Sequence, residues 1–79
     1  MRFHLNLHNA HVDTKDEEGI ELFDLSDARA QAIAGIRDFL AGEVRRAGKL
    51  DLHGHIDIMD DCGSLLETVQ FHEAVNILR

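Results

Sequence analysis

A long helical repeat of apolar residues constrains the fold of this chain more than any other feature. Apolar side chains recur at steps of three and four residues, at Leu25, Ala28, Ala32, Ile36, Phe39, Leu40, Val44 and Ala47. Asp24 or Ser26 can cap the start of this helix, and Gly48 suits the left-handed position after its end. A helix over residues 25–47 is roughly 34 Å long, whereas a strand of about seven residues spans roughly 23 Å. We therefore expect one helix that covers a sheet and overhangs it by about two turns.

Segments with a period of two lie on both sides of the predicted helix. Residues 2–9 alternate apolar and polar side chains, and residues 20–23 suit a short edge strand. Residues 54–60 and 65–71 predict two further strands. In the last of these, Glu67 shares the apolar face, which a bulge or an edge position would relieve.

The connecting segments carry turn signals rather than apolar periods. Residues 9–19 are acidic and predict a solvated loop. Residues 60–63 read Asp-Asp-Cys-Gly, which is typical of a hairpin turn that ends on a glycine. The last eight residues, 72–79, return to helical spacing together with Phe71 and predict a short helix or a cap over the sheet.

The order strand, strand, helix, strand, strand predicts an α+β fold with two layers. We expect a single domain over residues 1–79, in which one helix crosses one face of a four-stranded antiparallel sheet. The expected spatial order of the strands is 20–23, 2–9, 54–60 and 65–71. On the helix, Ile36, Phe39 and Leu40 are the predicted contacts to the sheet.

Charge and composition narrow the classes of function. Eight basic and fifteen acidic residues give a formal net charge of −7, which disfavours nucleic acids and anionic membranes as partners. The apolar content of 44% predicts a folded chain, and no apolar run is long enough to span a membrane. The alternating start and the single cysteine argue against secretion. We expect a soluble, cytoplasmic protein.

Six histidines are the main oddity of the composition. His4 and His8 share the polar face of the first predicted strand, while His53 and His55 share one face of the third. If these strands are neighbours, the imidazoles converge on ligand types that suit zinc, nickel or copper, with Asp57 or a symmetry mate as a further ligand. Nothing in the spacing requires a third ligand, so the sequence predicts weak zinc binding or none. The competing interpretation is a solvated or partner-covered sheet face.

Other chemical sites have less support. A calcium loop that starts at Asp13 fails because Lys15 stands where a ligand oxygen is needed and Gly19 is one position late. Phosphate-binding glycine loops are absent, because Gly54 and Gly63 are isolated. The possible nucleophiles are Ser26, Ser64, Thr14, Thr68 and Cys62. None has an oriented histidine in the sequence pattern, and the acidic turn around Cys62 disfavours its thiolate. We therefore expect a protein without enzymatic activity.

Several segments resemble a family of short bacterial proteins that is classed as a domain of unknown function. The resemblance rests on Phe3-His4-Leu5, on DEEGIEL at 16–22, on DLSDARAQA at 24–32, and on segments 48–51, 60–63 and 69–75. The family more often has Pro where Phe23 stands and an acidic residue where Cys62 stands. It implies no catalytic residue. A partial likeness to HicB-type antitoxin domains rests on the strand hairpin before an Asp-Leu helix start.

The leading functional hypothesis is an accessory or regulatory module that acts by protein contact. The uncovered sheet face would carry His4, Asn6, His8, His55, Asp57, Met59, Leu66, Thr68 and Gln70. This face could pair with a second copy in a homodimer or contact another protein. The alternatives are a metal-binding protein that uses the histidines, and an antitoxin-like inhibitor of a basic partner.

Overall fold

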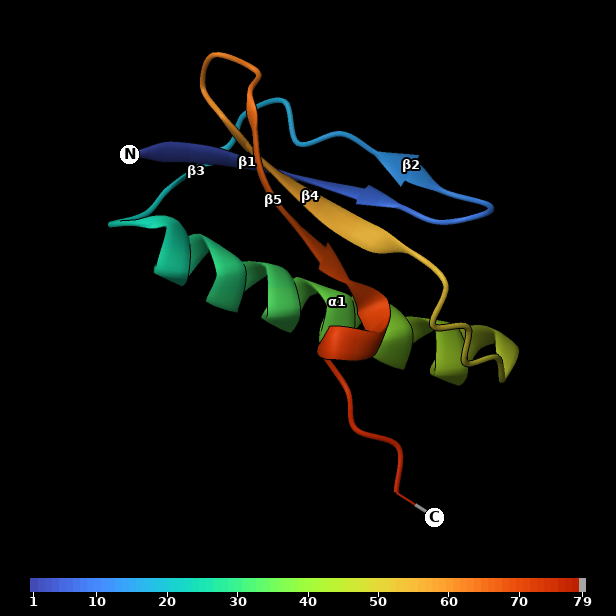
Figure 1. The fold of residues 1–79 in the computed structure, drawn as a ribbon. Helices are drawn as coiled ribbons and strands as arrows, with labels where there is room; N and C mark the ends of the chain where they lie inside the picture. Colours follow the sequence, from blue (N-terminus) through green and yellow to red (C-terminus); the bar gives the residue numbers. More distant parts are fainter. Residues whose placement is uncertain (79) are drawn as a thin grey trace.

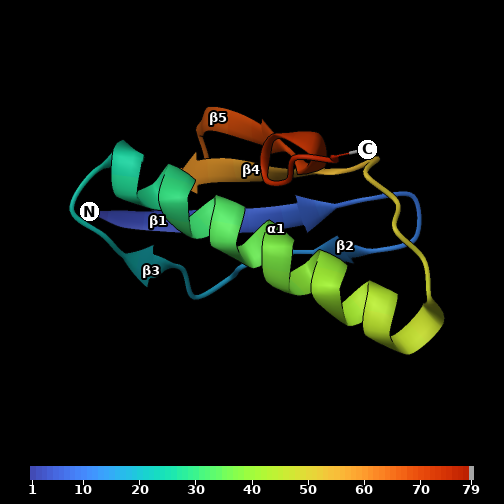
Figure 2. The same ribbon diagram turned by 90° about the horizontal axis from the view of Figure 1, so that it is seen from below.

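One helix packs against one face of an antiparallel sheet (Figure 1). The computed structural model describes residues 1–78. The elements in chain order are β1 Arg2–His8, β2 Asp13–Thr14, β3 Ile20–Glu21, α1 Leu25–Ala47, β4 His55–Asp60, β5 Leu65–Gln70 and the 3-10 helix η1 Phe71–Glu73. The predicted two-layer α+β class is confirmed, with α1 on one face of the sheet and the other face uncovered (Figures 1 and 2).

The sheet has the order β2-β1-β4-β5, and β3 also pairs with β1. The order expected for the four predicted strands is therefore correct, although the strand expected over 20–23 is limited to β3, and the sheet has five strands rather than four. The additional strand is β2, which lies in the segment predicted to be a solvated loop. The side chain of Asn9 accepts hydrogen bonds from the backbone N–H groups of His11 and Val12, at 2.8 and 2.6 Å. This turn folds the chain back so that β2 pairs with the end of β1.

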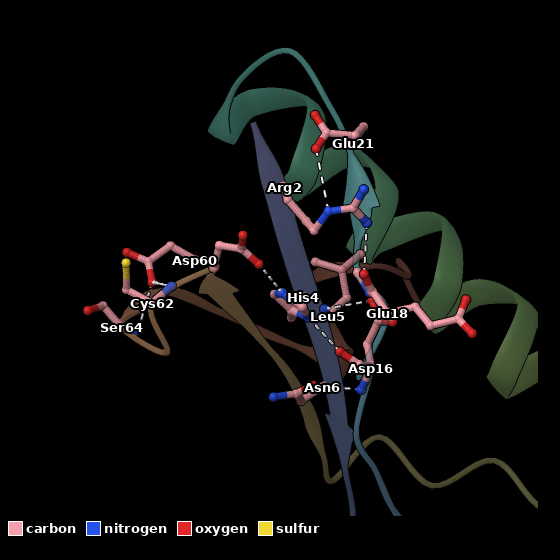
Figure 3. Close-up of polar contacts among 12 residues, drawn as sticks. Arg2, His4, Leu5, Asn6, Asp16, Glu18, Glu21, Asp60, Cys62 and Ser64 are labelled. Atoms are coloured by element: carbon pink, nitrogen blue, oxygen red, sulfur yellow. Dashed lines mark hydrogen bonds and ion pairs between the residues drawn. The ribbon is translucent and has the colours of Figure 1, made fainter.

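The remainder of the acidic loop is held against β1 by Asp16 (Figure 3). The Asp16 carboxylate accepts from the N–H groups of Leu5, at 3.3 Å, and Gly19, at 3.0 Å. The Asp16 N–H in turn donates to Asn6 Oδ1 at 2.8 Å. Sequence reasoning missed this structure because the β1 partners of Asp16, Leu5 and Asn6, lie ten or more positions earlier in the chain.

The helix has the predicted bounds because both of its ends carry local signals. Asp24 caps its start by accepting from the N–H of Asp27 at 2.9 Å, and Gly48 closes its end with a φ of 66°. The buried face consists of Ala28, Ala32, Ile36 and Leu40. Val44 is 47% exposed, because the last turns extend past the strands (Figure 2). The predicted core stripe is thus correct in its middle and wrong at Leu25, Val44 and Ala47, which are exposed.

The core lies between α1 and the inner face of β1, β4 and β5. Its buried residues are Phe3, Ala28, Ala32, Ile36, Leu40, Ile56, Ile58, Val69, Phe71 and Ala74. Phe39 is only partly buried and packs its ring 5.7 Å from that of Phe71. Of the three predicted helix contacts, Ile36 and Leu40 are fully in the core and Phe39 lies at its margin.

The position of Glu67 on the inner face is explained by the helix. Arg29 on α1 forms ion pairs with Glu67 on β5 and with Glu73 on η1. The predicted bulge is present as a register shift opposite Ile58 and Met59, and β5 is the edge strand beside β4. An acidic side chain on the helix-facing side is therefore paired rather than left without a counter-charge.

The C-terminal segment forms less helix than its spacing indicates. A 3-10 helix covers only Phe71–Glu73, and it is fixed by the Glu73 carboxylate, which accepts from the N–H of Gln70 at 2.7 Å. Residues 74–78 continue without regular structure, and residue 79 lies outside the described residues. Within residues 1–78, no helix has the length and apolar character that a membrane crossing requires.

Candidate metal centre

The pairing of β1 with β4 brings two histidines together on the uncovered face. His8 lies directly opposite His55, and Asn6 lies opposite Asp57. Since directly paired residues project to the same face of an antiparallel sheet, both rings lie beside Asp57. The ring centroids of His8 and His55 are 5.0 Å apart. Ligand atoms of these three side chains all lie within 4.8 Å of one another.

The distances in this cluster suit a shared ion better than direct hydrogen bonds. His8 Nε2 lies 3.5 Å from Asp57 Oδ2, and His55 Nε2 lies 3.7 Å from Asp57 Oδ1. Hydrogen bonds of this kind are usually about 2.7–3.2 Å long. Ligand atoms about 2.0–2.1 Å from a tetrahedral zinc ion are about 3.3 Å from each other. Small side-chain movements would therefore complete a three-donor site.

Two neighbouring side chains orient these donors. Asp13 on β2 accepts a hydrogen bond from His8 Nδ1 at 2.7 Å, which places the lone pair of the neutral ring on Nε2, toward Asp57. Thr68 on β5 donates its hydroxyl proton to Asp57 Oδ1 at 2.8 Å. Sequence reasoning considered Asp13 only for a calcium loop. The signal for its actual place is the turn at Asn9, which sets the register of β2 against β1.

The other two histidines proposed from the sequence lie outside this cluster. His4 lies opposite Met59, further along the sheet, and both of its ring nitrogens have other contacts. His53 precedes β4 and forms hydrogen bonds with Asp51. Among the described residues, the ligand cluster therefore contains one histidine from each predicted pair and not all four.

His4 connects two loops rather than forming part of a metal site. Its Nδ1 lies 2.7 Å from the Asp16 carbonyl, and its Nε2 lies 3.0 Å from the carboxylate of Asp61 in the β4–β5 turn (Figure 3). Both nitrogens face oxygen acceptors, so only the doubly protonated ring donates to both. The Asp61 carboxylate and then the Asp16 carbonyl raise the pKa of His4 above its ordinary value of 6.5.

We therefore expect His4 to stabilise the fold more in acid than in base. A raised pKa in the folded state gives a contribution that is fully present below pH 6.5 and lost as the pH rises through the raised pKa. The ring resonances of His4 in NMR spectra should titrate above pH 6.5 in the parent, and at a lower pH in Asp61→Asn. Titration of the parent at or below the ordinary value would contradict this assignment.

The possible nucleophiles lie apart from the histidines in hydrogen-bonding terms. Cys62 is exposed in the β4–β5 turn, where its N–H donates to Asp60 Oδ1 at 2.9 Å. The Thr68 hydroxyl is bound to Asp57. Across residues 1–78, none of the predicted hydroxyl or thiol nucleophiles forms a hydrogen bond with a histidine.

Comparison with known protein families gives a match over most of the chain. A model described as a domain of unknown function, DUF6894, matches residues 2–72. The chain belongs to this family. The match confirms the resemblance to a family of unknown function and covers every strand of the sheet together with α1. No curated protein and no solved structure gave a match. No comparison supports the likeness to HicB-type antitoxins. Phe23 and Cys62, the two positions at which the sequence analysis expects a departure from the family pattern, are both exposed.

Proposed function

We propose that this DUF6894 protein is a non-enzymatic module that binds one transition-metal ion of the zinc type. The ligands are His8, His55 and Asp57. The observation that carries this proposal is the convergence of two imidazoles and one carboxylate at near-coordination distances, while Asp13 occupies the other nitrogen of His8. Three electron-rich atoms that face one another favour a cation between them, and a metal ion uses all three.

The chemistry of the ligands favours borderline metals. Imidazole nitrogen with carboxylate oxygen suits zinc, nickel or copper, whereas calcium and magnesium select sets of oxygen ligands. The sequence left the third ligand open and predicted weak zinc binding or none. Asp57 now supplies that ligand from the same strand as His55. We therefore propose a dissociation constant for zinc of about 1 µM or below, at neutral pH.

The surroundings of the site support binding rather than catalysis. His8, His55 and Asp57 are half-buried on the open side of a sheet. A cavity of about 340 Å³ lies beside the C-terminal end of α1, and one of about 430 Å³ lies around His4. Neither cavity is lined by the three ligands.

Calorimetric titration with zinc tests the proposal. The parent should bind one ion per chain, and His8→Ala, His55→Ala and Asp57→Asn should each weaken binding by at least about 100-fold. His72→Ala is the matched control, because His72 is exposed on η1 outside the cluster. Parent binding clearly weaker than about 1 µM, or loss of affinity in the control equal to that in the three variants, would overturn the proposal.

The role of Asp13 provides a separate prediction. Asp13→Asn keeps the size of the side chain but removes the carboxylate that orients His8. We expect zinc affinity to fall by about 10-fold to 100-fold while the fold is retained. Glu17→Gln, a change to another acidic side chain of the same segment, is the control. Equal affinities for the two variants would show that Asp13 does not act through His8.

A further inference from the structure

The proposed metal site is incomplete within one chain. It has three protein ligands, whereas structural zinc sites are closed by four. Because α1 covers the opposite face of the sheet, the open position faces away from the domain (Figures 1 and 2). A water molecule or a side chain from another molecule can occupy it.

We infer that a second copy of this chain supplies the fourth ligand through His53, so that zinc joins two copies across the uncovered sheet face. This inference rests on the proposed function. In a two-fold symmetric pair, each copy would give His53 to the site of the other, and the pair would hold two ions.

His53 has the orientation that such a ligand needs. Its side chain is 97% exposed, and its Nδ1 lies 2.8 Å from Asp51 Oδ1. The backbone N–H of His53 donates to the same oxygen at 3.0 Å. The hydrogen bonds of His53 with residues 1–78 are these two, which leave Nε2 directed to solvent. This arrangement matches that of His8, in which a carboxylate occupies Nδ1 and leaves Nε2 for an ion.

The backbone around His53 explains why this residue does not bind the ion held by His8, His55 and Asp57 of the same chain. Gly54, between His53 and His55, has a φ of 153°, and its carbonyl accepts from the N–H of Phe71 at 2.9 Å. The chain is thus held at the start of β4, and the ligand atoms of His53 lie outside the cluster of His8, His55 and Asp57. To bind the ion in its own chain, His53 would have to leave Asp51.

Charge makes the pairing depend on the metal. Each chain has a formal net charge of −7, and the uncovered face carries Asp57 with Asp13 beside it. Two copies without metal therefore repel each other, and a divalent ion in each site offsets that repulsion. The sheet also offers apolar contact area at this end, since Leu65, which is 57% exposed, lies opposite the half-buried Met59.

Sedimentation velocity with and without zinc tests the inference. The parent should be a monomer in a chelator and a dimer at one zinc per chain. His53→Ala should still bind one zinc ion in calorimetry but remain a monomer, and the control His72→Ala should dimerise like the parent. A parent that binds zinc and stays monomeric would overturn the inference and leave the proposed function intact. A His53→Ala chain that still dimerises with zinc would also overturn it.

A mixing experiment separates a ligand in the second copy from one in the same chain. His53→Ala keeps the three-ligand site, and the double variant with His8→Ala and His55→Ala keeps His53. Neither variant should dimerise alone with zinc, whereas their mixture should form a heterodimer around one complete site. If His53 binds in its own chain, the mixture stays monomeric and the inference fails. Absence of zinc binding by the parent would remove the proposed function and this inference together.

Discussion

Replacing Gly54 with alanine is expected to lower the free energy of unfolding by about 3 kcal/mol. A Cβ at this position would lie 2.6 Å from Phe71 Cε2 and 2.8 Å from the carbonyl oxygen of His8. The φ of 153° adds backbone strain for any side chain. Because the clash involves backbone and a buried ring, neither neighbour can move aside at low cost.

Urea denaturation of Gly54→Ala and of Gly42→Ala measures this effect against a matched control. Gly42 lies within α1, and an added Cβ there would meet no atom within 4 Å. Alanine at that position should stabilise the helix by up to about 1 kcal/mol. The two glycine substitutions should therefore have opposite signs. A Gly54→Ala protein as stable as the parent would show that the start of β4 does not approach Phe71 and His8 this closely.

Truncation of Phe71 is expected to lower the free energy of unfolding by about 4 kcal/mol, more than the substitution of Gly54. Phe71 is fully buried at the junction of β5 and η1, where it contacts Phe39 and approaches Gly54. A domain of this size is stabilised by about 4–12 kcal/mol, so Phe71→Ala should leave a large unfolded fraction at 37 °C.

The sequence pattern predicted that Phe39→Ala would cost about 3–5 kcal/mol. Its partial burial lowers our expected cost to about 2 kcal/mol. Phe23→Ala is the control, because Phe23 is 85% exposed and its truncation should change stability by less than about 0.5 kcal/mol. Thermal melts followed by circular dichroism should therefore rank the variants Phe71, Phe39 and Phe23 from least to most stable. A Phe39 variant less stable than the Phe71 variant would contradict this assignment of the core.

The elements that could be read from the sequence are those whose signals are local. Asp24 and Gly48 are adjacent to the helix that they delimit, and the helical bounds were predicted correctly. The alternation in β1, β4 and β5 identified three strands, and in β1 and β4 it also identified the sides that they bury. In β5 it failed at Leu65, which is exposed beyond the register shift. A bulge or an edge position was expected for Glu67 because one charged residue broke an otherwise regular apolar face, and β5 has both.

The candidate site could be predicted only in part, because it depends on contacts between distant segments. Its residue types were visible as histidine pairs, and Asp57 was among the possible third ligands. The choice of His8 over His4, and of His55 over His53, required the register of β1 against β4. The contribution of Asp13 required β2, whose two residues have no periodicity of their own.

The sequence by itself determined the helix, the longer strands and the acidic charge, since each follows from neighbouring residues or from composition. The strand order followed from the order of the elements along the chain and the rules for connecting them. Tertiary structure decided which histidines meet, that Asp16 is bound rather than solvated, and that the ends of the apolar stripe are exposed. The physical reason is that register and helix overhang depend on how the whole sheet and helix pack. A shift of one residue in the pairing of β1 and β4 would turn the alternating side chains to the other face and separate His8 from His55.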